Sequence, residues 1–160
     1  MIRAVVALTV LMWMGGSPRE PVQRGAGTAS VTVPPTLSFQ IPNISVATVA
    51  TGPTTVSFAN AIVPGAEVLR ISVKADGNLT KAGAPSIAAS LISWTVSGVN
   101  NGTGMNGVLS TSTYTPVFLG SNGKKSGSLN IAWTLAAPGT NVRAGTYQTT
   151  LRWKFEAVNP

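Results

Sequence analysis

Four segments of this 160-residue chain alternate apolar and polar residues with a period of two, and this pattern constrains the fold more than any other feature. In a β-strand successive side chains point to opposite faces, so the alternation is typical of half-buried antiparallel strands. The segments are 69–75, 91–96, 128–135 and 147–157. Weaker strands are predicted at 36–41, 44–50, 54–59, 108–112 and 115–119.

Turn signals separate these runs. Asn-Gly or Asp-Gly pairs occur at 76–77, 101–102, 106–107 and 122–123, and they supply the positive φ that tight turns need. The only weak helix candidate is 82–91. Short strands at this spacing predict an all-β fold, an antiparallel two-sheet sandwich of Greek-key, Ig-like type with about eight or nine strands.

The N-terminus has the pattern of a secretory signal peptide. Met1 to Arg3 is a positive start, and 4–14 is an apolar run too short to span a bilayer. Small residues, which a signal-peptide cleavage site needs, occur at 15–17 and at 27–29, so there are two candidate cleavage sites. We therefore expect 1–29 to be signal peptide and leader or tether, 30–160 to be a single domain, and the protein to be secreted or at the cell surface. Membrane contact is expected only through the cleaved signal peptide.

The side chains that most enzymes need are missing. The chain has no His and no Cys, which removes the usual general base, the thiol nucleophile and most zinc or copper ligands. Only four acids remain, Glu20, Glu67, Asp76 and Glu156, and no paired arrangement for glycoside hydrolysis is evident among them. The composition predicts a non-catalytic protein without cofactor or metal.

The net charge is +7, and from Ser30 onward eight basic against three acidic residues leave +5. This excess serves solubility or attracts a polyanion. Arg70 and Lys74 share the polar face of one predicted strand, and Arg152 and Lys154 share that of another. If the two strands are neighbours, a stripe of four cations results. For an exported protein we interpret such a stripe as a contact for anionic polysaccharide rather than nucleic acid; the alternative is protection of a sheet edge against aggregation.

Tryptophans mark three of the strong strands. Each lies in an apolar alternation, so core packing is the simplest interpretation. The alternative is an exposed aromatic row that stacks on sugar rings, for which Trp94 and Trp133 are the better candidates because Trp153 shares its face with Leu151 and Phe155.

The C-terminal stretch 144–155, AGTYQTTLRWKF, resembles the closing strand of bacterial surface β-sandwiches. It is most similar to the WxL-type domain, with Tyr147, Leu151 and Trp153 in the terminal pattern and Phe155 in the place of its Leu. The stretches 94–96 (WTV) and 133–135 (WTL) stand for the other Trp-x-Leu motif. This resemblance implies non-covalent attachment to a bacterial cell wall. A second resemblance, to pilin-like and spore-coat-U-like subunits that end in a comparable AGTY strand, implies assembly with other subunits.

Two functions follow as expectations. The first is a secreted surface protein that binds cell-wall polymer or glycan through a basic, Thr-rich sheet face. The second is a structural, pilin-like subunit that assembles by strand exchange, as a homo-oligomer or with other surface proteins. The segment 30–50 is the candidate donor strand, and its prolines confine it to an edge or an arm.

Overall fold

The computed structural model describes residues 30–63 and 65–160. The predicted signal peptide and tether at 1–29 lie outside the described residues. No helix in the described part of the chain is long and apolar enough to cross a membrane.

The described chain forms two antiparallel sheets, which confirms the predicted all-β, two-sheet fold. The first sheet has the order β1-β4-β10-β6-β8, with β3 beside β10; its strands are β1 (Ser30–Thr32), β3 (Thr48–Val49), β4 (Thr54–Ala59), β6 (Ile92–Asn100), β8 (Gly107–Val108) and β10 (Gly127–Leu135). The second has the order β2-β11-β5-β9-β7; its strands are β2 (Thr36–Ile41), β5 (Val68–Ala75), β7 (Gly102–Gly104), β9 (Thr115–Gly120) and β11 (Gly145–Val158).

The described residues form 11 strands where about eight or nine were expected. Four of them, β1, β3, β7 and β8, contain only two or three residues. A run that short cannot show a period of two, so these strands are defined by their neighbours in space rather than by their own sequence.

Two predicted strands are much shorter than the sequence suggested. The segment 44–50 contributes only β3, because the chain turns at 44–46, where Asn43 Oδ1 accepts a hydrogen bond from the Ser45 N–H. The segment 108–112 contributes only the end of β8. The weak helix candidate at 82–91 ends in one short 3₁₀ turn, Ala89–Leu91.

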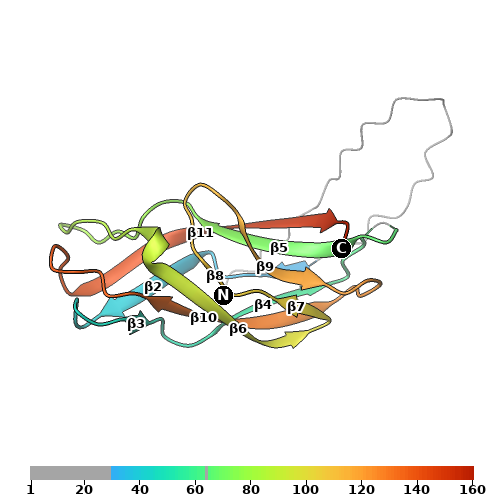
Figure 1. Ribbon diagram of the computed structural model, residues 1–160, viewed down its shortest axis with the longest axis horizontal. Helices are drawn as coiled ribbons and strands as arrows, with labels where there is room; N and C mark the ends of the chain where they lie inside the picture. Colours follow the sequence, from blue (N-terminus) through green and yellow to red (C-terminus); the bar gives the residue numbers. More distant parts are fainter. Residues whose placement is uncertain (1–29, 64) are drawn as a thin grey trace, which may run out of the picture.

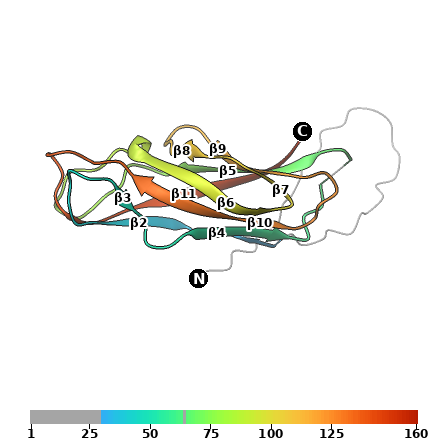
Figure 2. The ribbon, with the colours of Figure 1, turned by 60° about the horizontal axis from the view of Figure 1, so that its bottom comes forward.

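The chain crosses between the sheets after almost every long strand. From β2 through β4, β5, β6, β9 and β10 to β11, each long strand lies in the opposite sheet from the one before (Figure 1). The sheets also meet along one side. There Asn101, with a φ of 60°, joins β6 of the first sheet directly to β7 of the second. Figure 2 shows β4, β10 and β6 in front of β5 and β11.

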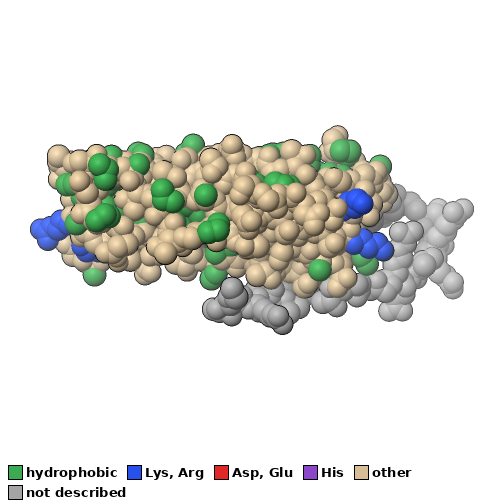
Figure 3. Space-filling view, turned by 90° about the horizontal axis from the view of Figure 1, so that it is seen from below, with side chains coloured by type: hydrophobic (Ala, Val, Ile, Leu, Met, Phe, Trp, Pro, Cys, Tyr) green, Lys and Arg blue, Asp and Glu red, His purple; other side chains and the backbone are tan. Residues whose placement is uncertain are grey.

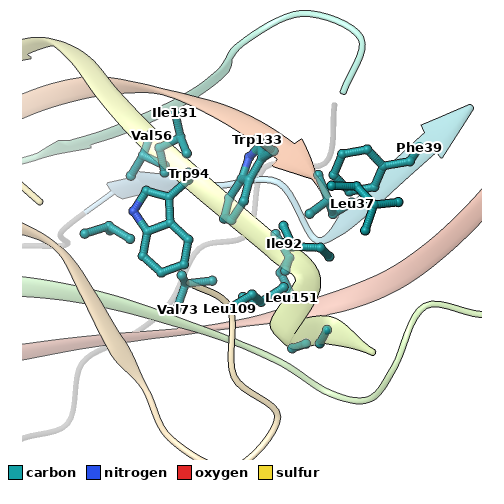
Figure 4. Packing of buried hydrophobic residues seen from close by; sticks show 14 of the residues in the cluster. Leu37, Phe39, Val56, Val73, Ile92, Trp94, Leu109, Ile131, Trp133 and Leu151 are labelled. Carbon is teal, nitrogen blue, oxygen red and sulfur yellow. The ribbon is translucent and has the colours of Figure 1, made fainter. Parts of the chain in front are cut away.

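The core lies between the sheets and is built from the inward-facing half of each alternation. In β10 buried and half-exposed residues alternate without a break over nine positions. Trp94 and Trp133 meet edge to face at its centre, with ring centroids 5.4 Å apart. Figure 4 shows both indole rings among Val56, Ile92 and other aliphatic side chains.

The AGTY sequence has a structural role in this fold. Gly145 has a φ of 133°, a conformation that other residues rarely adopt, and Lys81 packs where its side chain would lie. The buried Tyr147 accepts a hydrogen bond at its hydroxyl from the backbone N–H of Arg143, 3.4 Å away. This pair of features fixes the turn that leads into β11.

Candidate functional site

All charged residues that belong to strands lie on β5 and β11. These are Arg70 and Lys74 on β5, and Arg152, Lys154 and Glu156 on β11. None of the six strands of the first sheet carries a charge within the described residues. The other charged residues described are in connections: Glu67, Asp76, Lys81, Lys124, Lys125 and Arg143.

Because β5 and β11 are neighbours, the four predicted cations come together on the outer face of the second sheet. The antiparallel register places Arg152 opposite Lys74 and Glu156 opposite Arg70, while Lys154 faces Ser72. The two strands run side by side along the molecule in Figure 1. We call the set Arg70, Lys74, Asp76, Arg152, Lys154 and Glu156 the charged ladder.

Two acids that the sequence analysis did not connect with the stripe are part of the ladder. Asp76 accepts two hydrogen bonds from Arg152, from Nε to Oδ1 at 2.6 Å and from Nη2 to Oδ2 at 2.9 Å. Glu156 is shared: its Oε1 lies 2.7 Å from Arg70 Nη2, and its Oε2 lies 2.7 Å from Lys154 Nζ. Four cations against two acids leave two positive charges on the ladder.

These pairs also shift the acids' titration. The hydrogen bond from Arg152 holds the pKa of Asp76 below its ordinary value, and the same contact raises the pKa of Arg152. The hydrogen bond from Lys154, followed by that from Arg70, lowers the pKa of Glu156. Both carboxylates are therefore charged at neutral pH, and the ladder keeps its excess of positive charge there.

Lys74 is the cation of the ladder with no ion pair in the described part of the chain. Its Nζ lies 5.2 Å from the centre of the Tyr114 ring, within range of a cation–π contact. Lys74 is half-buried as a residue, and it lies opposite Arg152 in the register of the strand pair. An incoming anion can therefore contact Lys74 without competing with a carboxylate of the ladder for an ion pair.

Trp94 and Trp133, predicted as alternative sugar-stacking residues, lie in the core. Their exposed fractions are 2% and 0%. Each indole N–H is satisfied internally, by the carbonyl of Met105 for Trp94 and by the hydroxyl of Thr54 for Trp133. Neither ring can stack on a ligand at the surface. The expectation of an aromatic binding row is therefore corrected, and the core interpretation accounts for both residues.

A polar cleft of about 390 Å³ adjoins the Asp76 end of the ladder. Its lining comes from the start of β2, from the connection after β5 and from the first half of β11: Thr36, Asp76, Gly77, Asn78, Thr80, Gln148, Thr149 and Thr150. Two backbone contacts to β11 frame the cleft, Asp76 N–H to Thr150 and Thr80 N–H to Gln148. Between them the chain has three residues, 77–79, where β11 has only Thr149. The sequence indicates only a turn at 76–78, and nothing in its pattern predicts this cleft.

The strands of the opposite face carry no charge within the described residues, and most of their outward side chains are polar; Val49 of β3 and Val108 of β8 are exposed apolar exceptions. Outward residues of β4, β10 and β6 are Ser, Thr, Asn and Ala, such as Thr55, Asn130 and Thr95. Figure 3, the view from below onto these strands, shows Lys and Arg side chains only near the two ends. The molecule thus has one charged sheet face and one neutral sheet face.

The edge-protection interpretation of the cations also has support. β2 pairs with β11 only over Gly145 to Thr150, since Pro34 and Pro35 lack the N–H groups that would extend the pairing. Beyond Leu151, which donates to the Pro35 carbonyl, no described strand pairs with that side of β11. Among residues 30–63 and 65–160, the charged half of β11 is therefore the half whose edge no strand covers.

No protein-family model matches this sequence, and no curated protein and no solved structure is similar enough to count as a match. The resemblance to WxL-type domains and to pilin-like subunits stays a prediction.

Proposed function

We propose that this protein is a non-catalytic, exported surface-binding module that holds an anionic cell-wall polymer or glycan against the outer face of β5 and β11. The observation that carries the proposal is the segregation of charge: every charged strand residue lies on this one strand pair, with cations in excess. Scattered charges that served solubility alone would have no reason to avoid six strands of the other sheet.

The ladder suits a polymer better than a small ligand. Its cations follow the strands, so they can contact successive anionic groups of an extended chain, each contact being weak because it is exposed to solvent. Arg152 and Arg70 keep free N–H groups after binding Asp76 and Glu156, since a guanidinium has five donors. An anion can therefore join these ion pairs without breaking them.

Binding of this kind must weaken with salt and with loss of the ladder's charge. We expect the double variant Lys74→Gln/Lys154→Gln to bind purified anionic wall polymer about tenfold more weakly than the wild type at low salt. The matched control, Lys124→Gln/Lys125→Gln, removes the same charge from the connection between β9 and β10 and should change affinity by less than about twofold.

Titration calorimetry at several salt concentrations measures both effects. Equal losses in the two double variants would mean that net charge, not the ladder, attracts the polymer. Binding that does not weaken with salt would contradict the proposal as a whole.

A second candidate function is assembly by strand exchange, and the short edge strand β1 favours it. The predicted donor segment 30–50 forms β1 and β2 at the edges of the two sheets and the two-residue β3 beside β10, and β1 has only three residues. Release of β1 from β4 would leave each copy with a strand to donate and an edge to fill. A series of oligomers of increasing size that persists in high salt and mild denaturant would support this function over polymer binding.

The strand order supports a finer description of the fold. Without the short β1, β3 and β7, the sheets read β2-β11-β5-β9 and β4-β10-β6-β8. Alternation of sheets at every step except the one from β6 to β8 is the Greek-key connectivity of a jelly roll, whereas an Ig-like sandwich keeps its first two strands in one sheet. We therefore propose a jelly-roll rather than an Ig-like arrangement.

A further inference from the structure

The cleft beside the charged ladder is rich in hydrogen-bonding groups that the protein itself leaves free. Thr36, Thr80, Gln148 and Thr150 are all exposed, and none of their side chains makes a hydrogen bond within the described part of the chain. Asn78 uses its Oδ1 to accept from the Ala89 N–H, which leaves its amide donors free. The cleft thus offers hydroxyls that donate and accept beside two planar amides.

The cleft has no aromatic side chain in its lining. Sugar rings are commonly held by an aromatic face against their apolar side, and this cleft cannot supply one. A flexible linear polyol has no such apolar side, and its hydroxyls are satisfied by hydrogen bonds alone. The lining therefore fits a polyol unit better than a pyranose ring.

Charge and hydroxyl groups adjoin each other here. Asp76 belongs to both regions: it lines the cleft and anchors Arg152, which lies opposite Lys74. Its carboxylate also repels an anion placed in the cleft itself. A ligand that fills both regions must therefore place its anionic group over Arg152 and Lys74 and an uncharged hydroxylated unit in the cleft.

We propose that the polymer bound by this face is a polyol phosphate, in which a phosphodiester contacts Lys74 and Arg152 while the hydroxylated unit next to it occupies the cleft lined by Asn78, Thr80 and Gln148. This inference rests on the proposed function and adds the chemical class of the polymer. The phosphodiester supplies the charge, and the free hydroxyl supplies the specificity.

Two synthetic polymers separate charge from hydroxyl recognition: poly(glycerol phosphate), and poly(1,3-propanediol phosphate), which has the same phosphate spacing and lacks the hydroxyl. We expect the wild-type protein to bind the first about tenfold more tightly than the second in calorimetric titrations. The double variant Thr80→Val/Gln148→Ala should lower this preference to within about twofold, and should bind the hydroxyl-free polymer as the wild type does.

The control variant Thr95→Val/Ser97→Ala removes two exposed hydroxyls from β6 on the neutral face and should keep the full preference. Equal binding of the two polymers by the wild type, or an unchanged preference in the cleft variant, overturns the inference and leaves the proposed function standing. If the protein binds neither of these polymers and no other polyanion, the proposed function itself is overturned.

Discussion

At the scale of single residues, the alternation pattern predicts burial better than it predicts contacts. Trp94 and Trp133 are buried as an unbroken period of two requires, and no ligand role remains for them at the surface. The partners of Arg70 and Arg152 could not be predicted. Asp76 lies 76 residues from Arg152, and Glu156 lies 86 residues from Arg70, so only the register of β5 on β11 brings them together.

Truncation of the central tryptophan tests the core. We expect Trp133→Ala to lower the free energy of unfolding by about 3–5 kcal/mol, because it removes a fully buried ring and leaves a cavity. Tyr114→Ala, at a ring that is 37% exposed, should cost less than about 1 kcal/mol. Urea unfolding followed by circular dichroism measures both. Similar small losses in the two variants would show that Trp133 is not a core residue.

The ion pairs of Glu156 predict a pH dependence of stability. Its pKa is lowered in the folded protein from an ordinary value of 4.5, so the unfolded chain binds more protons as pH falls. The stabilisation is present above that ordinary value and is lost as pH falls through the lowered pKa. We expect Glu156→Gln to be about 1 kcal/mol less stable than the wild type at pH 7 and equally stable near pH 2.

Thermal unfolding of both proteins across this pH range measures the difference. Asp76, whose pKa is also lowered, remains in both proteins, so its contribution cancels in the comparison. A gap between the two proteins that stayed constant down to pH 2 would contradict the assigned ion pairs.

At the scale of elements, the sequence predicts the long strands well and the short ones poorly. The weaker predictions at 36–41 and 54–59 coincide with β2 and β4 at both ends. β3 and β7 have no pattern of their own, and they are strands only because β10 and β9 pair with them. The bulge after β5, which makes the cleft, likewise depends on how β11 pairs with both of its sides.

Close packing between elements is testable at a glycine. Gly107 of β8 lies against the Trp94 ring, where an added Cβ would come within 2.5 Å of Cζ2. We expect Gly107→Ala to destabilise the fold by about 1–3 kcal/mol. Gly77→Ala is the matched control, because nothing lies within 4 Å of its added Cβ, and it should change stability by less than about 0.5 kcal/mol. Equal stabilities in chemical denaturation would mean that β8 does not pack on Trp94 as described.

At the scale of the whole molecule, the sequence predicts the fold class and the direction of the charged side chains, but not which strands are neighbours. Composition indicated a basic, non-catalytic protein, and the alternation placed Arg70, Lys74, Arg152 and Lys154 on outward faces. That β5 and β11 adjoin, and that the first sheet carries no charge on its strands, follows only from the order of strands in space. This order turns scattered cations into one charged face opposite a neutral one.

The most direct test of this division is to locate bound polymer on the protein by NMR. Titration of the isotope-labelled protein with an anionic wall polymer should shift amide resonances of β5, of β11 and of the connection at 76–80, and leave those of β4, β6 and β10 unchanged. Shifts centred on the neutral sheet, or on Lys124 and Lys125 alone, would contradict the assignment of the β5–β11 face as the binding surface.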